Sequence, residues 1–405
     1  MKILILSTKM PWPPKDGGAI ATLNLAVGLA RNGASVTLLT MNTGKHYFPP
    51  EDIPEEINDL LKIHSVIVDT RIRPFSLLLN FLFSSYPYNA GRFISRAFKL
   101  ELEKCLAETN YDIVQIEGPY LGYYKQFIGD GPLLSMRAHN VEHRIWRLRS
   151  GEEKNPLKKI YFQSLARRIQ KLEKSLLSNI DILVPISSAD ADEFTSMHRD
   201  LPLHICPTGM ELDKYSTDNE NKPPIPQKET DLRIFYIGAL DWAPNREGLD
   251  WFFKSVWPSI LNQWPWMVIH VAGRNSGSYF KDKPPPNVYQ EGEVEDAISF
   301  YRENNIMVVP LLSGSGIRIK IIEAMALKKV VICSSIAASG LGVTHGKHLF
   351  IAESADDYLK ILGALLQDPL LVKETGHNAR RFILENFDNF DISKKLISFY
   401  KAQLT

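Results

Sequence analysis

The stretch "NIMVVPLLSGSGIRIKIIEAMALKKVVICS", residues 305–334, outlines a complete strand, loop, helix and strand. The run "MVVPL" is continuously apolar, which is typical of a strand buried on both faces of a parallel sheet. A glycine-rich loop follows, then apolar residues at helical spacing, then a second apolar run, "KVVICS". This order predicts parallel strands joined by a helix, which is the repeating unit of α/β folds.

Charged residues gather where that helix begins. Arg318 and Lys320 follow the glycines of "SGSG", and Glu323 lies about one turn further along. The backbone N–H groups of such a loop and the positive end of a helix form an anion site, to which Arg and Lys add full charges. A carboxylate beside them can accept hydrogen bonds from sugar hydroxyls. The pattern indicates a ligand with phosphate and sugar. The alternative is a solvated basic face on which Glu323 pairs with Lys320.

The alternation of strands and helices runs through both halves of the chain. The predicted strands are "KILILS", "ASVTLLT", "DIVQIEG", "GPLLSMRAHN" and "DILVPIS" in the first half, and "LRIFYIGAL", "MVIHVAG", "NIMVVPL" and "KVVICS" in the second. We also predict single helices over "AIATLNLAVGLARNG", which Gly33 closes, and over "NREGLDWFFKSVWPSIL". The polar, proline-rich residues 216–231 are predicted to form a linker or surface excursion. We therefore expect two doubly wound domains with a boundary near residues 207–215 and a ligand cleft between them.

Composition narrows the class of protein. A length of 405 residues favours two domains, and a net charge of +1 gives no reason to expect nucleic acid as a partner. The three cysteines lie far apart without CxxC spacing, which favours a reducing cytoplasm over a disulfide framework. The N-terminal apolar run is too short for a signal peptide, and "FSLLLNFLF" is shorter than the ~20 residues of a spanning helix. We expect a cytoplasmic protein without transmembrane segments.

Two further motifs follow predicted strands. "DGGA", residues 16–19, opens the first helix and is either a second anion position or a plain turn. The chain lacks a GxGxxG directly after the first strand, which disfavours a dinucleotide-dependent oxidoreductase. In "RAHNVEHR" we expect His139, Asn140 and Glu142 to face the cleft, with a purely structural hydrogen bond as the alternative for His139. His143 follows His139 by four residues, but the HExxH arrangement is absent, so we expect no metal site.

These motifs, in this order, resemble glycosyltransferase family 4, the retaining GT-B enzymes, over nearly the whole chain. The resemblance is carried by "GGAIATLNLAVGLARNGASVTLLT", "RAHNVEHRIW", "FYIGALDWAPNREGLDWF", "VAGR", "GSGIRIKIIEAMALKKVVICSS" and "FDISKKLISFYK". It implies the GT-B fold, in which two Rossmann-like domains face each other across a cleft. Residues 1–210 would bind the acceptor, residues 211–385 the nucleotide sugar, and the helix over residues 386–405 would cross back to the N-terminal domain.

The resemblance also implies roles for matching residues. Glu323 matches the second glutamate of the family's paired motif and would bind ribose, while Arg318 and Lys320 would supply cations for the diphosphate. His139 matches a histidine that contacts the donor sugar, so these four form the expected catalytic set. The expected donor-binding residues are Gly17, Gly18, Gly238, Arg274, Gly314, Ser315, Gly316, Arg318, Lys320 and Glu323.

Two positions depart from the family pattern. The first glutamate of the paired motif is Ser315 in this chain, which places the identity of the sugar in doubt. The usual Arg and Lys after the "GAL" strand are replaced by "DWAPNREG", with Asn245 and Arg246 near the expected place. We therefore assign the diphosphate to Arg318 and Lys320 as a hypothesis.

The activity implied by the resemblance is retaining transfer of a sugar from a UDP- or GDP-sugar to a glycan or lipid-linked acceptor, in surface polysaccharide or glycoconjugate synthesis. Charge that develops on the leaving diphosphate would be stabilised by fixed cations and N–H groups. The family reaction is front-face displacement, in which the leaving phosphate takes the acceptor's proton, and no metal or other cofactor is expected. A non-hydrolysing epimerase and a non-catalytic nucleotide-sugar sensor remain alternatives.

Two segments of the first half combine apolar, aromatic and basic residues. They are residues 71–99 and residues 143–177, and the second holds ten Lys or Arg against three acids. Basic amphipathic segments bind anionic lipid surfaces. We expect peripheral attachment to the inner face of a membrane, against the alternative of an ordinary solvated basic face.

Overall fold

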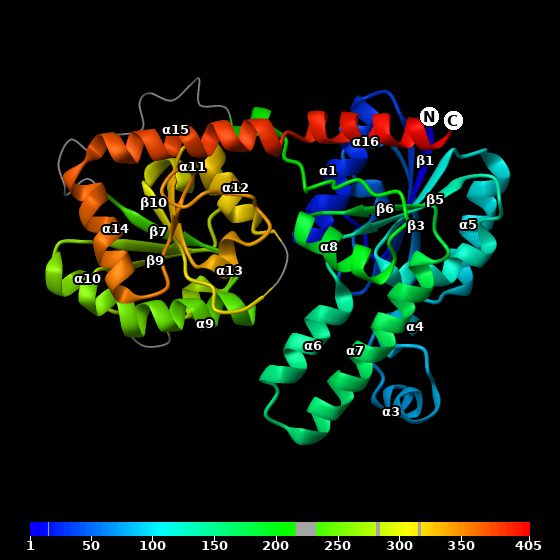
Figure 1. Ribbon diagram of the computed structural model, residues 1–405, viewed down its shortest axis with the longest axis horizontal. Helices are drawn as coiled ribbons and strands as arrows, with labels where there is room; N and C mark the ends of the chain where they lie inside the picture. Colours follow the sequence, from blue (N-terminus) through cyan, green and yellow to red (C-terminus); the bar gives the residue numbers. More distant parts are fainter. Residues whose placement is uncertain (15, 216–231, 281–283, 315–316) are drawn as a thin grey trace. The chain divides into compact units, whose positions relative to one another are not determined.

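The computed structural model describes residues 1–14, 16–215, 232–280, 284–314 and 317–405. The predicted linker at residues 216–231 lies outside them. The chain divides into two compact units, Met1–Met210 with Asn389–Thr405 (unit 1) and Glu211–Asp388 (unit 2). Each unit has its own sheet and hydrophobic core (Figure 1). No helix among the described residues is long and apolar enough to cross a membrane.

Unit 1 is built on a six-stranded parallel sheet with the order β3-β2-β1-β4-β5-β6. The strands are β1 (Lys2–Ser7), β2 (Ser35–Thr43), β3 (Leu61–Val68), β4 (Ile113–Glu117), β5 (Leu133–Ala138) and β6 (Ile182–Pro185). Successive side chains of β1 enter opposite cores, Leu4 and Leu6 on one face and Ile3 and Ile5 on the other. The apolar run that predicted β1 is therefore explained by burial on both faces.

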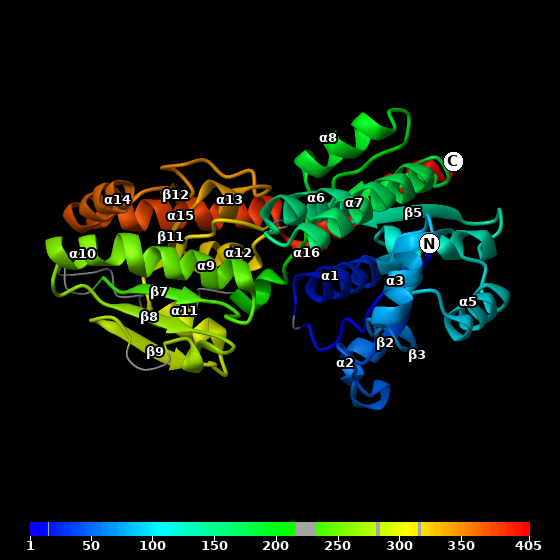
Figure 2. The same ribbon diagram turned by 90° about the horizontal axis from the view of Figure 1, so that it is seen from below.

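Helices cover both faces of this sheet (Figure 2). The helices of unit 1 are α1 (Gly17–Arg31), α2 (Glu55–Asn58), α3 (Pro74–Phe83), α4 (Tyr88–Gly91), α5 (Arg96–Glu108), α6 (Glu142–Glu152), α7 (Pro156–Leu177), α8 (Ser188–Met197) and α16 (Asn389–Gln403). The residues of α16 pack with α1 in one core. A Cβ on Gly28 would lie 2.2 Å from Ser393 Oγ, so glycine permits this close approach. The last helix therefore packs on the N-terminal unit, as the GT-B expectation requires.

Unit 2 repeats the design with the strand order β12-β11-β10-β7-β8-β9. The strands are β7 (Ile234–Ile237), β8 (Ile269–Ala272), β9 (Val288–Gly292), β10 (Ile306–Val309), β11 (Val330–Cys333) and β12 (Phe350–Ile351). The helices are α9 (Ala243–Trp251), α10 (Trp257–Gln263), α11 (Ala297–Glu303), α12 (Ile319–Ala326), α13 (Ser335–Ala338), α14 (Ala355–Gln367) and α15 (Pro369–Asn386). The opening stretch thus supplies β10, α12 and β11, as predicted.

One predicted helix is interrupted. The stretch "NREGLDWFFKSVWPSIL" forms α9 and α10, separated by a π-helical turn over Phe252–Val256. Pro258 has no N–H to donate, and its ring would collide with the carbonyl of Lys254 four residues earlier in a regular helix. A π turn lies directly before this proline, where the regular hydrogen-bond ladder is interrupted. The predicted helix is therefore present, with one π-helical turn in its middle.

Candidate functional site

The order of the strands indicates where each unit would hold a ligand. β1 lies between β2 and β4, and β7 lies between β8 and β10, so connections leave each first strand in both directions. Open parallel sheets bind ligands outside the carboxyl ends of their strands at such a switch point. Two groups of side chains occupy these positions, one in each unit.

A pocket of about 400 Å³ opens in unit 1 at the carboxyl ends of β1, β4 and β5. Gly18 and His139, two of the predicted site residues, line it, and so do Asn140 and Glu142. Gly17 begins α1 and is exposed. The pocket therefore brings the first glycine loop and the "RAHNVEHR" motif together within the N-terminal unit.

His139 is fixed by a buried carboxylate. Its Nε2 lies 2.6 Å from Oε2 of Glu117, the last residue of β4, and Thr22 Oγ1 donates to the same oxygen at 2.9 Å. Burial opposes the charge, but the Arg137 guanidinium and His139 hold the pKa of Glu117 at about 2. Because Glu117 is ionised at neutral pH, His139 donates its Nε2–H, which leaves Nδ1 as the ring nitrogen open to a ligand.

A chain of hydrogen bonds connects this pair to the last helix. Gln115 Nε2 donates to Glu117 Oε1 at 2.5 Å, and the Tyr400 hydroxyl donates to Gln115 Oε1 at 2.7 Å. The Ser135 hydroxyl lies 2.9 Å from the same tyrosine oxygen. All three partners are buried, so the orientation of Glu117 depends on α16 as well as on the sheet.

A second carboxylate in the pocket has the opposite character. Burial raises the pKa of Glu142 to about 7, and the negative charge of Glu173 adds to this rise. The Tyr120 hydroxyl, which donates to Glu142 at 2.8 Å, opposes it. Glu173 itself lies 2.6 Å from His143 Nδ1, so His143 and His139 engage different carboxylates. A carboxyl group with a pKa near neutrality can exchange a proton with a ligand hydroxyl.

The rest of the wall is largely basic. Lys9, Lys45, His46 and Arg92 all line the pocket. Lys9 Nζ lies 2.5 Å from Oδ1 of Asp16, the N-cap of α1. Burial lowers the pKa of His46, and Asp16 balances Lys9, so Lys45 and Arg92 are the cations that would favour an anionic group of a ligand.

In unit 2 the two cations of the opening stretch turn inward. Lys320 Nζ donates to the Tyr236 hydroxyl and to Asn245 Oδ1, both at 3.0 Å, and lies 4.3 Å from the centre of the Tyr236 ring. Arg318, the N-cap of α12, is only 6% exposed, and its guanidinium lies 5.7 Å from the Trp242 ring. The alternative of a solvated basic face is therefore wrong.

Burial makes the charge of both cations costly. Burial lowers the pKa of Arg318 to about 10. Burial and the neighbouring Arg318 charge lower the pKa of Lys320 to about 7, although Glu323 opposes this shift. Two buried like charges held close together would be stabilised by an incoming anion.

Glu323 is held by two tyrosines. The Tyr215 and Tyr301 hydroxyls donate to its Oε1 and Oε2, each at 3.0 Å. Burial raises the pKa of Glu323, and both hydroxyls and Lys320 oppose that rise. Each carboxylate oxygen keeps a further lone pair, so the group can still accept hydrogen bonds from neighbouring hydroxyls.

The predicted glycines and Arg274 surround this cluster. A Cβ on Gly238 would lie 2.9 Å from Lys320 Nζ, and a Cβ on Gly273 would lie 2.3 Å from Gly238 O, so the ends of β7 and β8 need glycine. Gly314 has a φ of +109°, which favours glycine. Arg274 is exposed and lies 3.1 Å from Asp241. Ser315 and Gly316, the remaining predicted residues, lie outside the described residues.

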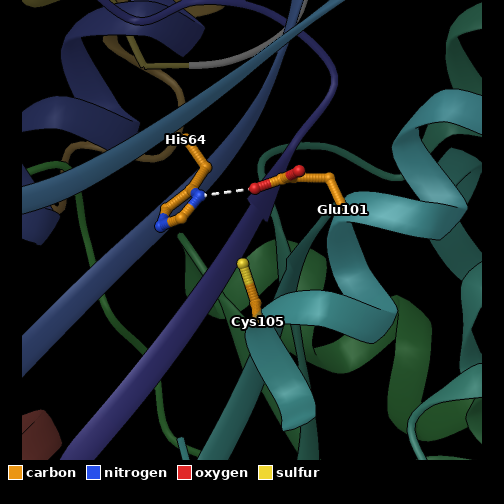
Figure 3. A group of neighbouring side chains, drawn as sticks. All are labelled: His64, Glu101 and Cys105. Atoms are coloured by element: carbon orange, nitrogen blue, oxygen red, sulfur yellow. Dashed lines mark hydrogen bonds and ion pairs between the residues drawn. The ribbon is translucent and has the colours of Figure 1, made fainter. Parts of the chain in front are cut away.

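A third group of side chains lies away from both clusters. Within the described ranges, candidate metal-ligand atoms of His64 on β3 and of Glu101 and Cys105 on α5 lie within 4.8 Å of one another (Figure 3). His64 Nδ1 lies 2.7 Å from Glu101 Oε1, and burial raises the pKa of the Cys105 thiol to about 11. A protonated thiol is a poor ligand, so a strand–helix hydrogen bond accounts for this arrangement.

Several residues of both clusters were not predicted from the sequence. Glu117 carries a detectable signal, because an ionisable residue ends the apolar strand "DIVQIE". Tyr236 likewise sits at the end of the strand "IFYI". Tyr215 and Tyr301 come from a short 3₁₀ helix and from α11, and reach Glu323 only through the fold.

Comparison with known proteins adds the following. Residues 231–368 match the family model described as glycosyl transferases group 1. An uncharacterized 44.6 kDa protein in the cps region of Klebsiella pneumoniae is 27% identical over 412 residues, covering 98% of each chain. The capsular polysaccharide biosynthesis glycosyltransferase CapM of Staphylococcus aureus is 32% identical over 203 residues, covering 48% of this chain and 53% of CapM.

The fold also has relatives among solved structures. Anabaena Alr3699/HepE, solved in complex with UDP, superposes with a TM-score of 0.67 at 14% identity, covering 99% of this chain and 100% of HepE. Two Rossmann-like units, each with a six-stranded parallel sheet, confirm the predicted GT-B architecture. The matching domain and the sequence relatives support a glycosyltransferase.

Proposed function

We propose that this chain of GT-B fold is a glycosyltransferase that moves a sugar with retention of configuration from a UDP- or GDP-sugar to a glycan or lipid-linked acceptor. The match of residues 231–368 to glycosyl transferases group 1 supports this. The observation that carries the proposal is the pair of inward-facing cations at the mouth of α12. Lys320 is positioned by Tyr236 and Asn245, next to the buried Arg318. HepE, which shares the fold, was solved in complex with UDP, which supports a nucleotide as the ligand.

The two cations suit the diphosphate of the donor. When the bond between sugar and phosphate breaks, negative charge grows on the leaving diphosphate, and fixed charges that are already in place stabilise it. Arg318 can bind two phosphate oxygens in a planar fork, while Lys320 acts as a point charge. Glu323, oriented by Tyr215 and Tyr301, would accept hydrogen bonds from ribose hydroxyls.

The pocket of unit 1 suits the acceptor and the transferred sugar. His139, oriented by Glu117, would contact the donor sugar through Nδ1. In front-face displacement the departing phosphate oxygen accepts the acceptor's hydroxyl proton while the new glycosidic bond forms on the same face. The basic wall at Lys45 and Arg92 would hold an anionic group of the acceptor, such as the phosphate of a lipid-linked sugar.

The biological setting follows from the relatives. CapM and the cps-region protein support a role in surface polysaccharide synthesis. We further propose that the enzyme is cytoplasmic and peripherally bound to the inner face of the membrane. We propose that the reaction needs no metal or other cofactor, because the cations of the chain can neutralise the leaving group.

A thermal-shift panel of nucleotide sugars tests the donor. A ligand at 100 times its dissociation constant stabilises the fold by about 2.7 kcal/mol, which is a readily measured shift. We expect UDP- or GDP-sugars to raise the melting temperature of the wild type and to lose most of that effect with Arg318→Ala and Lys320→Ala. If no nucleotide sugar stabilises the protein, the proposal fails. Incubation of the bound donor with membrane extract, read by the anomeric configuration of the product, then tests transfer and retention.

A further inference from the structure

Helix α3 is the most exposed apolar element of unit 1. Its sequence, "PFSLLLNFLF", contains no charged residue, and none of its ten residues is buried. Phe75 is 73% exposed and Phe83 is 81% exposed. Soluble proteins rarely leave a contiguous apolar face in water, so an exposed face of this kind indicates a binding surface.

The helix is nevertheless attached firmly to its neighbour α7. Arg168 on α7 donates to Asn80 O at 3.0 Å and to Phe81 O at 2.7 Å. Phe81 also packs edge-to-face against Tyr161 with 5.6 Å between ring centres. Figure 1 shows α3 beside α7. The side of α3 at Asn80 and Phe81 is thus committed to α7, and the exposed apolar face is built into the fold.

Helix α7 also carries exposed apolar residues. Leu157 is 76% exposed in the first turn of α7, and Ile160 one turn later is also exposed. We call the exposed apolar residues of the two helices the apolar face. Its members are Phe75, Leu78, Leu79, Leu82, Phe83, Leu157 and Ile160.

The α6–α7 hairpin, whose second helix contacts α3, carries many exposed cations. These cations, which we call the basic set, are Arg144, Arg147, Arg149, Lys154, Lys158, Lys159, Arg167, Lys171 and Lys174. The acids of the hairpin's connecting end are Glu152 and Glu153. The excess of positive charge next to an apolar face matches the chemistry of an anionic lipid surface, which offers phosphate groups above hydrocarbon.

The dimensions fit a helix that lies in the interface. Ten residues of α-helix are ~15 Å long, whereas a spanning helix needs ~20 residues. An uncharged apolar helix of this length can be buried at the boundary between headgroups and acyl chains.

We propose that the apolar face and the basic set dock unit 1 on an anionic lipid bilayer, with α3 lying in the membrane interface. The reason for such docking rests on the proposed function, because a lipid-linked acceptor presents its headgroup at the membrane surface. Thr70, which lies four residues before α3 begins at Pro74, lines the pocket. Its carbonyl oxygen accepts from Arg92 Nη1 at 2.8 Å. Docking would bring the basic pocket wall towards the lipid headgroups.

Co-sedimentation of the full chain with vesicles tests the proposal. One set is phosphatidylcholine alone, and the other is phosphatidylcholine mixed with phosphatidylglycerol. The variants are Phe75→Ser with Phe83→Ser for the apolar face and Lys158→Gln with Lys159→Gln for the basic set. The matched controls are Leu370→Ser and Lys254→Gln, exposed residues of unit 2. All changed side chains are exposed, so each variant should fold.

We expect the wild type and both controls to bind the anionic vesicles more tightly than the neutral ones. Each basic residue near an anionic surface adds roughly 1 kcal/mol, so the Lys158 and Lys159 variant should bind ~10-fold or more weakly. The Phe75 and Phe83 variant should lose binding to both vesicle types. Equal binding of wild type and Phe variant, or no preference for anionic vesicles, would overturn the proposal.

A second copy of the chain is the competing occupant of the apolar face. Analytical ultracentrifugation without vesicles distinguishes it, because the Phe variant would then convert a dimer to a monomer, which would also overturn the proposal. Binding of UDP and GDP is measured on the same variants. Loss of vesicle binding with nucleotide binding intact supports membrane docking on its own, whereas a wild type that binds vesicles but no nucleotide contradicts only the proposed function.

Discussion

The two candidate site clusters place charge at equivalent positions of similar sheets but balance it differently. In unit 1, Glu117 is surrounded by Arg137, His139 and Thr22, which hold its pKa at about 2. In unit 2, burial and Arg318 lower the pKa of Lys320 to about 7, while burial raises the pKa of Glu323. The first cluster is internally neutralised and fixes the position of a histidine. The second buries two cations, Arg318 and Lys320, close together.

The largest effect on stability should come from breaking the Glu117 cluster of unit 1. Glu117→Gln leaves Arg137 buried without its carboxylate, and breaking a buried pair costs ~3–5 kcal/mol. Urea denaturation measures the change, with Glu108→Gln, an exposed acid of α5 next to Lys62, as the control that should stay within ~0.5 kcal/mol. A variant at Glu117 as stable as the wild type would show that the pair does not contribute to stability.

The Glu117 cluster should also make the stability of the fold depend on pH in the acid range. The pKa of Glu117 falls from 4.5 to about 2 on folding, so its contribution is present above pH 4.5 and is lost as the pH falls towards 2. Denaturation curves of wild type and Glu117→Gln should therefore converge in acid. Curves that stay parallel across this range would contradict the cause given for the lowered pKa.

The cluster of unit 2, with Arg318 and Lys320, should affect ligand affinity more than stability. Lys320→Met removes a charge that is costly to bury and also two hydrogen bonds, so the free energy of unfolding without ligand should not fall. A hydrogen bond to a charged group contributes ~1.5–3 kcal/mol, so affinity for UDP or GDP should fall ~10- to 100-fold. Calorimetric titration measures the affinity, and the exposed Lys373→Met on α15 is the control. Unchanged affinity would remove Lys320 from the diphosphate site.

The pH dependence sharpens this contrast. The pKa of Lys320 falls from 10.5 to about 7 on folding, so the unfolded chain binds more protons between these values. Stability without ligand should therefore rise with pH across this window, and Lys320→Met should lose that part of the slope. A wild-type slope that survives unchanged in the variant would assign it to other groups.

A smaller effect is expected at the tyrosines of Glu323. Tyr301→Phe removes a donor at 3.0 Å, which should cost ~1 kcal/mol and raise the pKa of Glu323 further. If Glu323 binds ribose, the variant should also discriminate less between UDP and its deoxyribose analogue. Full retention of that discrimination would argue that Glu323 has only a structural role.

The smallest effect on stability should come from the exposed residue Arg274. Arg274 and Asp241 are both exposed and 3.1 Å apart, and exposed pairs contribute ~0–1 kcal/mol. Arg274→Ala should therefore leave stability nearly unchanged. A loss of nucleotide affinity with Arg274→Ala would identify it as a donor ligand, as the family resemblance implies.

The sequence predicted the central strands of both sheets and the mouth of α12, because strands buried on both faces leave unbroken apolar runs. It missed β3, β9 and β12 at the edges, where exposed positions such as Lys62 interrupt the apolar run. The cations were found because glycines precede them in the chain. Their partners Tyr236 and Asn245 were not assigned this role, since only the packing of α9 and α12 on the sheet brings them within 3.0 Å of Lys320.

The central claim is that a nucleotide diphosphate binds beside Arg318 and Lys320 in unit 2. Calorimetric titration of UDP and GDP near pH 8, in buffers of different ionisation enthalpy, tests it directly. An anion next to Lys320 should raise its pKa from about 7, so binding should take up as much as ~1 proton, and this uptake should vanish with Lys320→Met. If neither nucleotide binds, or if the variant binds with the same affinity and proton uptake, the claim is wrong.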